Sequence, residues 1–308
     1  MEASLSKPDN AYPICFHNGN FVSWEQAVIH ANCLSMRYAL SVFEGIRLYR
    51  QPPIDELKPF ALEAHIDRLG RSLALMLLPD PGISQIDSII KDLVIKNQII
   101  EDTYIRVAVN TINFGELASP PTPSLTVTGT KMGRKRWLAQ GKKMKVSISK
   151  WQRTAELAFP SAAKNISNYA GPRLALLEAI AAGYDSTILI NHEGYLCEAP
   201  TAALFIIQDE EVVTPPLSEG ILPSITRKTI LQLCDLLGIR ATERRLRPAD
   251  AYLADEAFLC GTGIEIAPIA SFDGHSLKKT AESPITNKIC QAYFQLVRGE
   301  ISCYTNLM

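Results

Sequence analysis

The chain has 308 residues, of which 47% are hydrophobic and 20% charged, which is enough for one large domain or two ordinary ones with their own cores. A formal net charge of −1 gives no sign of a nucleic-acid or membrane-surface partner, and no apolar run approaches the ~20 residues that span a bilayer. Scattered cysteines, the lack of HxxxH spacing and an N-terminal stretch without a signal-peptide pattern predict a cytoplasmic protein with no disulfide framework and no zinc site.

The first part of the chain alternates strand and helix patterns. Residues 14–24 predict a hairpin, because Asn18-Gly19 is a favoured tight-turn pair. Apolar residues spaced by three and four predict a helix that starts near Leu62 and ends before Pro79. A second helix is predicted over 86–99, and strands over 103–112 and 122–130.

A basic, turn-prone segment, "KMGRKRWLAQGKK" (131–143), separates this part from the next and is typical of a solvated connector. The patterns beyond it predict, in chain order, a strand, a helix after a lysine-containing loop, two antiparallel strand pairs, a helix that ends at Gly238, a strand–turn–strand unit and a last helix. These elements cover residues 144–149, 172–183, 186–199, 202–216, 224–238, 256–270 and 285–299.

Hairpins and strand pairs mixed with helices indicate an α+β fold rather than a doubly wound parallel sheet. We predict a small N-terminal α/β domain over residues 1–130, a linker over 131–142 and a larger C-terminal domain over 143–308. The "GTG" at 261–263 is no dinucleotide fingerprint, because it lacks the third glycine and opens a strand.

The loop "FPSAAKNISNYAG" (159–171) places Lys164 among small and polar residues with no acid beside it. Most lysines are solvated surface charges, and that is the ordinary alternative here. A lysine amine in a pocket can instead form a Schiff base, and small neighbours let a flat ring approach. Tyr169 could then hydrogen-bond a phenolic oxygen of that ring.

Tyr104 and Arg106 lie on one face of an alternating strand, opposite the aliphatic residues of the same strand. A solvent-facing surface is the ordinary explanation of such a face. Arginine also binds carboxylates in bidentate geometry, so the face could hold an anionic group.

Three further features could bind a cofactor. Ser224, Ile225 and Thr226 start a helix, where free N–H groups and a hydroxyl can hold a phosphate, although Ser224 could simply cap the helix. Glu198 is a carboxylate in an apolar strand pair and could accept from a protonated ring nitrogen, or lie at a strand end in solvent. Arg68 flanks an apolar helix stripe. Together these groups are what pyridoxal phosphate needs.

The order and wording of these segments resemble the branched-chain amino acid aminotransferases, of the D-alanine-aminotransferase-like class of fold type IV pyridoxal-phosphate enzymes. The resemblance runs almost from end to end. It rests on "SVFEGIRLY" (41–49), "HIDRL" (65–69), "YIR" (104–106), "AAKNISNY" (162–169), "GYLCEA" (194–199), "LPSITR" (222–227), "YLADEAFLCGT" (252–262) and "NKICQAYFQL" (287–296).

The resemblance implies a two-domain fold with a pseudo-barrel in the larger domain and pyridoxal 5'-phosphate as cofactor. Lys164 would be the Schiff-base lysine and proton shuttle. The other cofactor-binding residues implied are Glu198 at the pyridine nitrogen, Tyr169 near the ring hydroxyl, Arg68, Ile225 and Thr226 at the phosphate, and Thr262.

On the substrate side, the resemblance implies that Thr262 and Gly263 hold the α-carboxylate. Tyr38, Phe43, Tyr104 and Arg106 would form the pocket wall, with Arg106 receiving the side-chain carboxylate of glutamate. Substrates would be a hydrophobic, branched-chain L-amino acid and a 2-oxo acid such as 2-oxoglutarate. The protein would be a homodimer or a larger homo-oligomer, with Tyr38 supplied by the neighbouring subunit.

The sequence departs from the family pattern mainly on the substrate side. Ala39 replaces a usual glycine, Ala203 stands where asparagine is common, and the usual aromatics fall on Gly129 and Met132. We therefore expect a pocket of altered shape.

Two alternatives stay open at this point. One is another enzyme of the same fold, either a D-amino-acid or (R)-amine aminotransferase or an aminodeoxychorismate lyase. The other is a protein that binds pyridoxal phosphate without turnover, which the retained Lys164, Glu198 and Arg68 argue against.

Overall fold

The computed structural model describes residues 7–53, 56–133 and 141–301. Contacts divide the chain into two compact units. The first contains the residues up to Gly133 together with Ala163–Ser167, and the second contains the other described residues. Residues 134–140 of the predicted linker lie outside the described chain. The part of the lysine loop from Ala163 to Ser167 therefore belongs to the first unit, although it lies within the segment predicted as the C-terminal domain.

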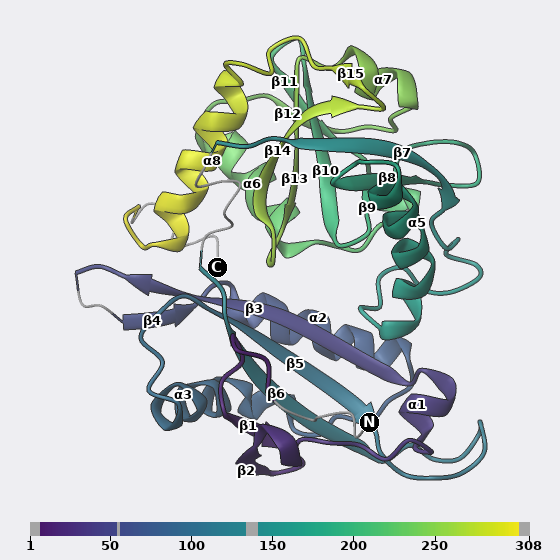
Figure 1. Cartoon of the computed structure of the whole chain (residues 1–308), viewed down its shortest axis with the longest axis vertical. Coiled ribbons are helices and arrows are strands. Elements are labelled where there is room, and N and C mark those ends of the chain that lie inside the picture. The colour runs from purple at the N-terminus through teal and green to yellow at the C-terminus, as the bar shows by residue number, and fades with distance from the viewer. Residues whose placement is uncertain (1–6, 54–55, 134–140, 302–308) are drawn as a thin grey trace. The chain divides into compact units, whose positions relative to one another are not determined.

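The first unit contains a six-stranded antiparallel sheet with the order β2-β1-β6-β5-β3-β4 (Figure 1). The strands are β1 (Ile14–His17), β2 (Asn20–Ser23), β3 (Ser41–Gln51), β4 (Glu56–Pro59), β5 (Thr103–Thr111) and β6 (Pro123–Lys131). The α-helices are α1 (Leu34–Tyr38), α2 (Leu62–Leu75) and α3 (Ile86–Lys96), and short 3-10 turns cover Trp24–Gln26 and Ile83–Gln85.

Strand alternation gives this sheet one apolar face and one mixed face. The apolar stripes of α2 and α3 pack on the first face, where Leu69 and Leu93 meet Ile46, Ile105 and Val107. Register places residues of the opposite parity on the other face. Those used below are Phe43, Gly45, Tyr104, Arg106 and Thr128.

The second unit contains the remaining strands and helices. Its strands are β7 (Met144–Gln152), β8 (Ser186–Ile190), β9 (Glu198–Ala199), β10 (Ala202–Gln208), β11 (Glu211–Thr214), β12 (Ala241–Glu243), β13 (Glu256–Gly261), β14 (Glu265–Phe272) and β15 (His275–Ser276). Its α-helices are α5 (Ala170–Ala181), α6 (Ile225–Leu236), α7 (Pro248–Leu253) and α8 (Pro284–Val297). A 3-10 turn over Ile166–Tyr169 precedes α5 and another covers Leu217–Glu219.

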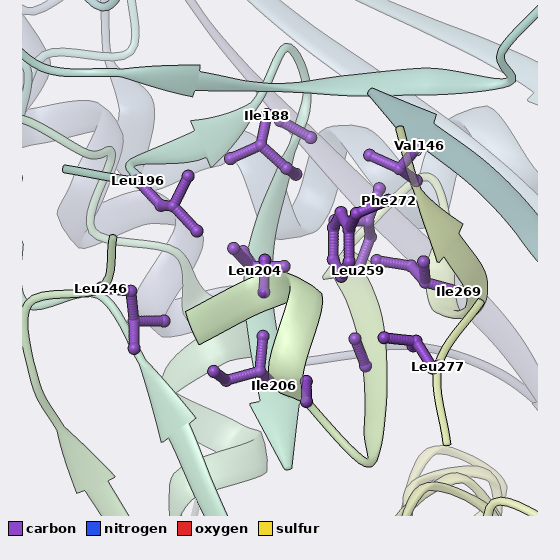
Figure 2. Close-up of a cluster of buried hydrophobic side chains, with 14 of the residues drawn as sticks. Val146, Ile188, Leu196, Leu204, Ile206, Leu246, Leu259, Ile269, Phe272 and Leu277 are labelled. Carbon is purple, nitrogen blue, oxygen red and sulfur yellow. The ribbon is translucent and has the colours of Figure 1, made fainter. Parts of the chain in front are cut away.

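Six strands of the second unit form a closed circuit. The sheet runs β10-β13-β14-β7-β8, an antiparallel bridge joins Ile190 of β8 to Leu196, and β9 then pairs with β10. Apolar side chains fill the interior, among them Leu196, Leu204 and Leu259 (Figure 2). The closed circuit is the pseudo-barrel expected of the larger domain, and the mixture of antiparallel strands and helices confirms the α+β class.

The local predictions agree with these elements. Asn18 and Gly19 both have positive φ in the predicted hairpin, and Gly238 has positive φ just after α6. The pair predicted over 186–199 is antiparallel, because the N–H of Cys197 donates to the Leu189 carbonyl and the N–H of Asn191 to the Tyr195 carbonyl, both at 2.8 Å, on either side of the Ile190–Leu196 bridge. The parallel pairing of β8 with β7 was not predicted, since parallel partners distant in sequence leave no turn signal.

Candidate functional site

Lys164 is held through its backbone by two elements of the first unit. Its N–H donates to Ser72 Oγ of α2 at 3.0 Å, and its carbonyl accepts from the N–H of Phe43 in β3 at 3.0 Å. Asn165 continues the contact as a bridge to Val42. The half-buried side chain places Nζ 4.7 Å from the centre of the Phe43 ring. The lysine is therefore fixed in place, unlike an ordinary solvated surface lysine.

Phe43 brings Lys164 and Arg106 together. The Arg106 guanidinium lies 4.1 Å from the centre of the same ring, so two cations contact one aromatic side chain. Cation–π contacts of this kind are worth about 0.5–1 kcal/mol at exposed sites. Three of the predicted residues thus lie together on the mixed face of the sheet.

Tyr104 also lies on this face, against Gly45 of β3. A Cβ atom at Gly45 would come within 1.9 Å of the Tyr104 hydroxyl oxygen, so only glycine admits the tyrosine there. The glycine of "FEG" therefore sets the position of a predicted pocket residue.

Tyr38 ends α1, where its hydroxyl accepts from Arg37 Nη2 at 2.9 Å. The next residue, Ala39, has φ 56 and ψ 33, a left-handed conformation that favours glycine.

Gly129 stands where the family pattern has an aromatic residue, and this change was expected to alter the shape of the substrate pocket. Gly129 does not line the mixed face, however. A Cβ atom there would meet Tyr12, Ile105 and Leu93 at 3.1–3.5 Å, all on the helix-covered side. Thr128 is the β6 residue paired with Arg106. The parity of β6 therefore makes Thr128, and not Gly129, the neighbour of the pocket-wall residues.

Arg68 lies in a buried cluster on α2. Its Nε and Nη2 donate to Glu44 Oε1 and Oε2 at 2.6 and 2.8 Å, and His65 Nδ1 lies 2.7 Å from Glu44 Oε2. The exposed fractions are 4% for Arg68 and 1% each for Glu44 and His65. The predicted phosphate ligand is thus held rigidly by a carboxylate of β3.

Burial alone would raise the pKa of the Glu44 carboxyl, but Arg68 and the hydrogen bonds from Arg68 and His65 hold that pKa well below its usual range. Burial lowers the pKa of His65, an effect that Glu44 opposes and that Arg68 and Lys164 reinforce. At neutral pH the cluster therefore contains a carboxylate, a guanidinium and a neutral imidazole, with the Nδ1 proton directed at Glu44.

Glu198 is buried in the second unit, at 9% exposure, on the short strand β9. Its Oε1 accepts from Arg153 Nε at 2.8 Å, and both of its oxygens lie 3.2–3.3 Å from the N–H of Leu222. Arg153 Nη1 is buried without a hydrogen-bond partner among the described residues. The strand register pairs Glu198 with Ala203, one of the altered positions.

The N-cap of α6 lies two residues after Leu222, whose N–H contacts Glu198. Ser224 is the N-cap and accepts from the N–H of Arg227 at 3.2 Å, so the capping alternative for Ser224 is confirmed. Ile225 and Thr226 open the helix, with Thr226 buried. Helix N-termini bind phosphate because their first N–H groups lack partners within the helix.

The remaining predicted residues also belong to the second unit. Thr262 and Gly263 occupy the tight turn between β13 and β14, and a Cβ atom added at Gly261 would lie 3.2 Å from the Thr201 carbonyl oxygen. Tyr169 precedes α5 and is half-buried.

Sequence reasoning missed four polar residues that hold the predicted ones, namely Glu44, His65, Ser72 and Arg153. A partial signal existed for two of them. Glu44 shares strand parity with Val42 and Ile46, and His65 precedes Arg68 by one helical turn. Ser72 and Arg153 gave no signal, because their partners are distant in sequence.

The chemistry of these residues fits pyridoxal phosphate. In the first unit a fixed lysine amine and an arginine suit its carbonyl and its phosphate, and in the second unit a buried carboxylate and a helix N-terminus suit its ring nitrogen and its phosphate. Within residues 7–53, 56–133 and 141–301, no cluster of histidine, cysteine, aspartate and glutamate could hold a metal ion. Over the same residues no helix is both long and apolar enough to cross a membrane.

Known proteins share both the sequence and the fold. The branched-chain-amino-acid aminotransferase of Escherichia coli (strain K12) is 34% identical over 293 residues, which cover 92% of each chain. The branched-chain amino acid aminotransferase from Thermobaculum terrenum in PLP-form superposes with a TM-score of 0.90 at 32% identity, over 97% of this chain and 98% of that one. The branched-chain aminotransferase from Thermoproteus uzoniensis with norvaline gives 0.89 at 31%, over 95% and 97%.

A fold of type IV with this donor set defines an enzyme that transfers amino groups. Residues 41–272 match the family model for amino-transferase class IV, and the chain belongs to that family.

Proposed function

We propose that the protein is a pyridoxal-phosphate-dependent aminotransferase that moves an amino group between a branched-chain or other hydrophobic L-amino acid and a 2-oxo acid such as 2-oxoglutarate. The observation that carries the proposal is Lys164, fixed by α2 and β3 with its amine over Phe43. The substrate class is supported by the names of the relatives and by norvaline, an aliphatic amino acid, in one of the similar structures.

In this proposal each predicted residue would have a task toward the cofactor. Lys164 would bind it covalently, and Glu198, held by Arg153, would accept from its ring nitrogen. Tyr169 would bond the ring hydroxyl oxygen. Arg68, the N–H groups and hydroxyl at Ile225–Thr226, and Thr262 would hold the phosphate end.

When bound, pyridoxal phosphate supplies an electron sink that makes the substrate Cα–H acidic. Lys164 would be the general base and acid that takes and returns the proton of the substrate Cα. Its backbone bonds to Ser72 and Phe43 would hold the lysine in a fixed position for this task. The pocket wall (Tyr38, Phe43 and Tyr104) excludes water from apolar side chains.

Arg106 receives the side-chain carboxylate of glutamate or 2-oxoglutarate, and Thr262 and Gly263 receive the α-carboxylate. Arg106 stacks on Phe43, which restricts the positions open to its guanidinium. We further propose a cytoplasmic homodimer or larger homo-oligomer in which Tyr38 serves the neighbouring subunit, as the resemblance implies.

Borohydride reduction followed by peptide mapping tests the function. The cofactor should be found on Lys164, and Lys164→Ala should lose turnover. Lys150→Ala is the matched control, because Lys150 is an exposed lysine paired with Glu178, and it should leave activity unchanged. Label on another lysine, or normal turnover in Lys164→Ala, would refute the proposal.

The same preparation can be assayed with a panel of L- and D-amino acid donors. Turnover with branched-chain L-donors supports the proposed substrate class. Turnover confined to D-donors or (R)-amines would assign the other enzymes of this fold instead. A yellow protein whose spectrum no donor changes would be a binding protein without turnover.

A further inference from the structure

One face of α2 carries three polar residues, His65, Arg68 and Ser72, at spacings of three and four. All three are buried, and Ser72 has no exposed surface. His65 and Arg68 contact Glu44 of β3, whereas Ser72 contacts the lysine loop. Buried polar side chains on a core-facing helix are costly unless they are hydrogen-bonded. Each of these three side chains is hydrogen-bonded.

Ser72 joins the two predicted cofactor residues of the first unit. Its hydroxyl donates to the carbonyl oxygen of Arg68 at 2.8 Å and accepts from the N–H of Lys164 at 3.0 Å. On the other side, the Lys164 carbonyl accepts from Phe43 of β3. The peptide groups of Lys164 are thus held between a helix and a strand of the same unit.

We propose that Ser72 is a positioning residue for Lys164, which fixes the lysine backbone one helical turn from Arg68. The proposal rests on the proposed function for its catalytic meaning, since the task of Lys164 is assigned there. Ser72 touches neither substrate nor cofactor in this assignment and acts through the backbone of Lys164.

Replacing Ser72 should disturb the loop because the Lys164 N–H would lose its hydrogen-bond acceptor. Ser72→Ala removes the hydroxyl but should leave α2 intact, because alanine has the highest helix propensity. The Lys164 N–H would then lack this bond, which shifts or loosens the loop. Displacements of about 1 Å at a catalytic group can cost on the order of 10²-fold in rate.

The first measurement uses the cofactor-free protein and hydrogen exchange. Ser72→Ala should exchange the backbone amides of residues 163–167 faster than wild type. Leu73→Val is the control, since Leu73 is a buried residue of the same helix whose side chain packs in the apolar core. It should lower stability without a selective change in this loop.

The second measurement uses the cofactor-loaded protein. The visible absorbance of lysine-bound pyridoxal phosphate titrates with pH, and its midpoint reports the surroundings of the amine. Ser72→Ala should shift that midpoint and lower kcat about tenfold or more with a smaller change in KM. Leu73→Val should keep the wild-type midpoint.

Wild-type exchange and a wild-type midpoint in Ser72→Ala would overturn the proposal, as would equal changes in Leu73→Val. If wild type carries no cofactor on Lys164, the proposed function fails by itself. The exchange experiment still decides whether Ser72 holds the loop.

Discussion

Glu44, His65 and Arg68 form a buried cluster of ionisable side chains in the first unit. Three ionisable side chains are nearly fully buried on the core side of the sheet, which is tolerated because each is hydrogen-bonded within the cluster. Removing one partner would leave a buried charge without compensation. The cluster therefore ties the stability of the first unit to pH.

The first prediction concerns His65→Asn, which keeps an N–H donor but cannot titrate near neutrality. In the folded protein the pKa of His65 is lowered from 6.5. As the pH falls below 6.5, the unfolded chain therefore binds a proton more readily than the folded chain, and the free energy of unfolding decreases. The variant should flatten this fall between pH 6.5 and 5 by up to about 1.4 kcal/mol per pH unit. Urea unfolding at several pH values measures it.

The control is the pH 8 end of the same series, where the imidazole is neutral in both states and titration contributes nothing. The lowered pKa of Glu44 adds a further loss only below the ordinary glutamate range. An unchanged slope in His65→Asn would show that His65 does not carry this dependence.

The second prediction concerns Ala39, which adopts the left-handed conformation where the family pattern has glycine. An L-residue with a Cβ pays about 1–2 kcal/mol there, partly offset by the greater unfolded-state entropy of glycine. Ala39→Gly should therefore stabilise the protein by about 0.5–1 kcal/mol in urea unfolding. Ala74→Gly, inside α2 and exposed, should destabilise it by a similar amount.

At the scale of elements, strand parity decides which residues can form a pocket. Alternation puts Arg106 and Tyr104 on one side of β5 and Ile105 and Val107 on the other. The same rule turns Gly129 toward the helices and Thr128 toward Arg106. A substitution at Thr128 should consequently affect acceptor choice more directly than one at Gly129.

The third prediction concerns Arg106→Met, which removes the guanidinium and keeps most of the apolar volume. A carboxylate on Arg106 gains about 1.5–3 kcal/mol from a charge-assisted bond. Activity with 2-oxoglutarate should fall about tenfold or more, at ~1.4 kcal/mol per decade, while apolar 2-oxo acids change much less. Steady-state kinetics with both acceptor types provides the measurement.

Arg71→Met is the matched control, since Arg71 is an exposed arginine of α2. It should leave both acceptors unaffected. Equal losses with both acceptors in Arg106→Met would mean that Arg106 supports the fold or the α-carboxylate instead.

At the scale of the whole molecule, two separate segments of the chain contribute to the first unit. Residues 163–167 leave the second unit to join the first, where Ser72, Phe43 and Val42 bond them. The residues proposed to bind the cofactor are therefore divided between the two units. Lys164 and Arg68 are in the first unit, whereas Glu198, Ile225 and Thr226 are in the second.

The fourth prediction is oligomeric. A chain of 34.0 kDa that forms the proposed homodimer should have at least twice that mass in light scattering at micromolar concentration. Tyr38→Ala should then lower activity without changing the mass, because only its side chain is proposed to serve the neighbour. A monomeric mass with full activity would rule out a contribution from Tyr38 of another subunit.

The sequence by itself determined the local elements and the chemistry of the main groups. Periodicity located α2, α3 and β5, turn residues located the hairpin at Asn18-Gly19, and the motifs singled out Lys164 and Glu198. These features depend on neighbours within a few residues, and such interactions are written directly in the order of the chain.

Only the tertiary structure decided which distant residues meet. The bonds from Ser72 to Lys164, from Arg68 to Glu44 and from Arg153 to Glu198 join segments separated by 92, 24 and 45 positions. The parallel pairing of β7 with β8 and with β14 likewise depends on packing around a shared apolar interior. No local pattern encodes such pairs, because their energy comes from burial and hydrogen bonding that exist only once the chain has folded.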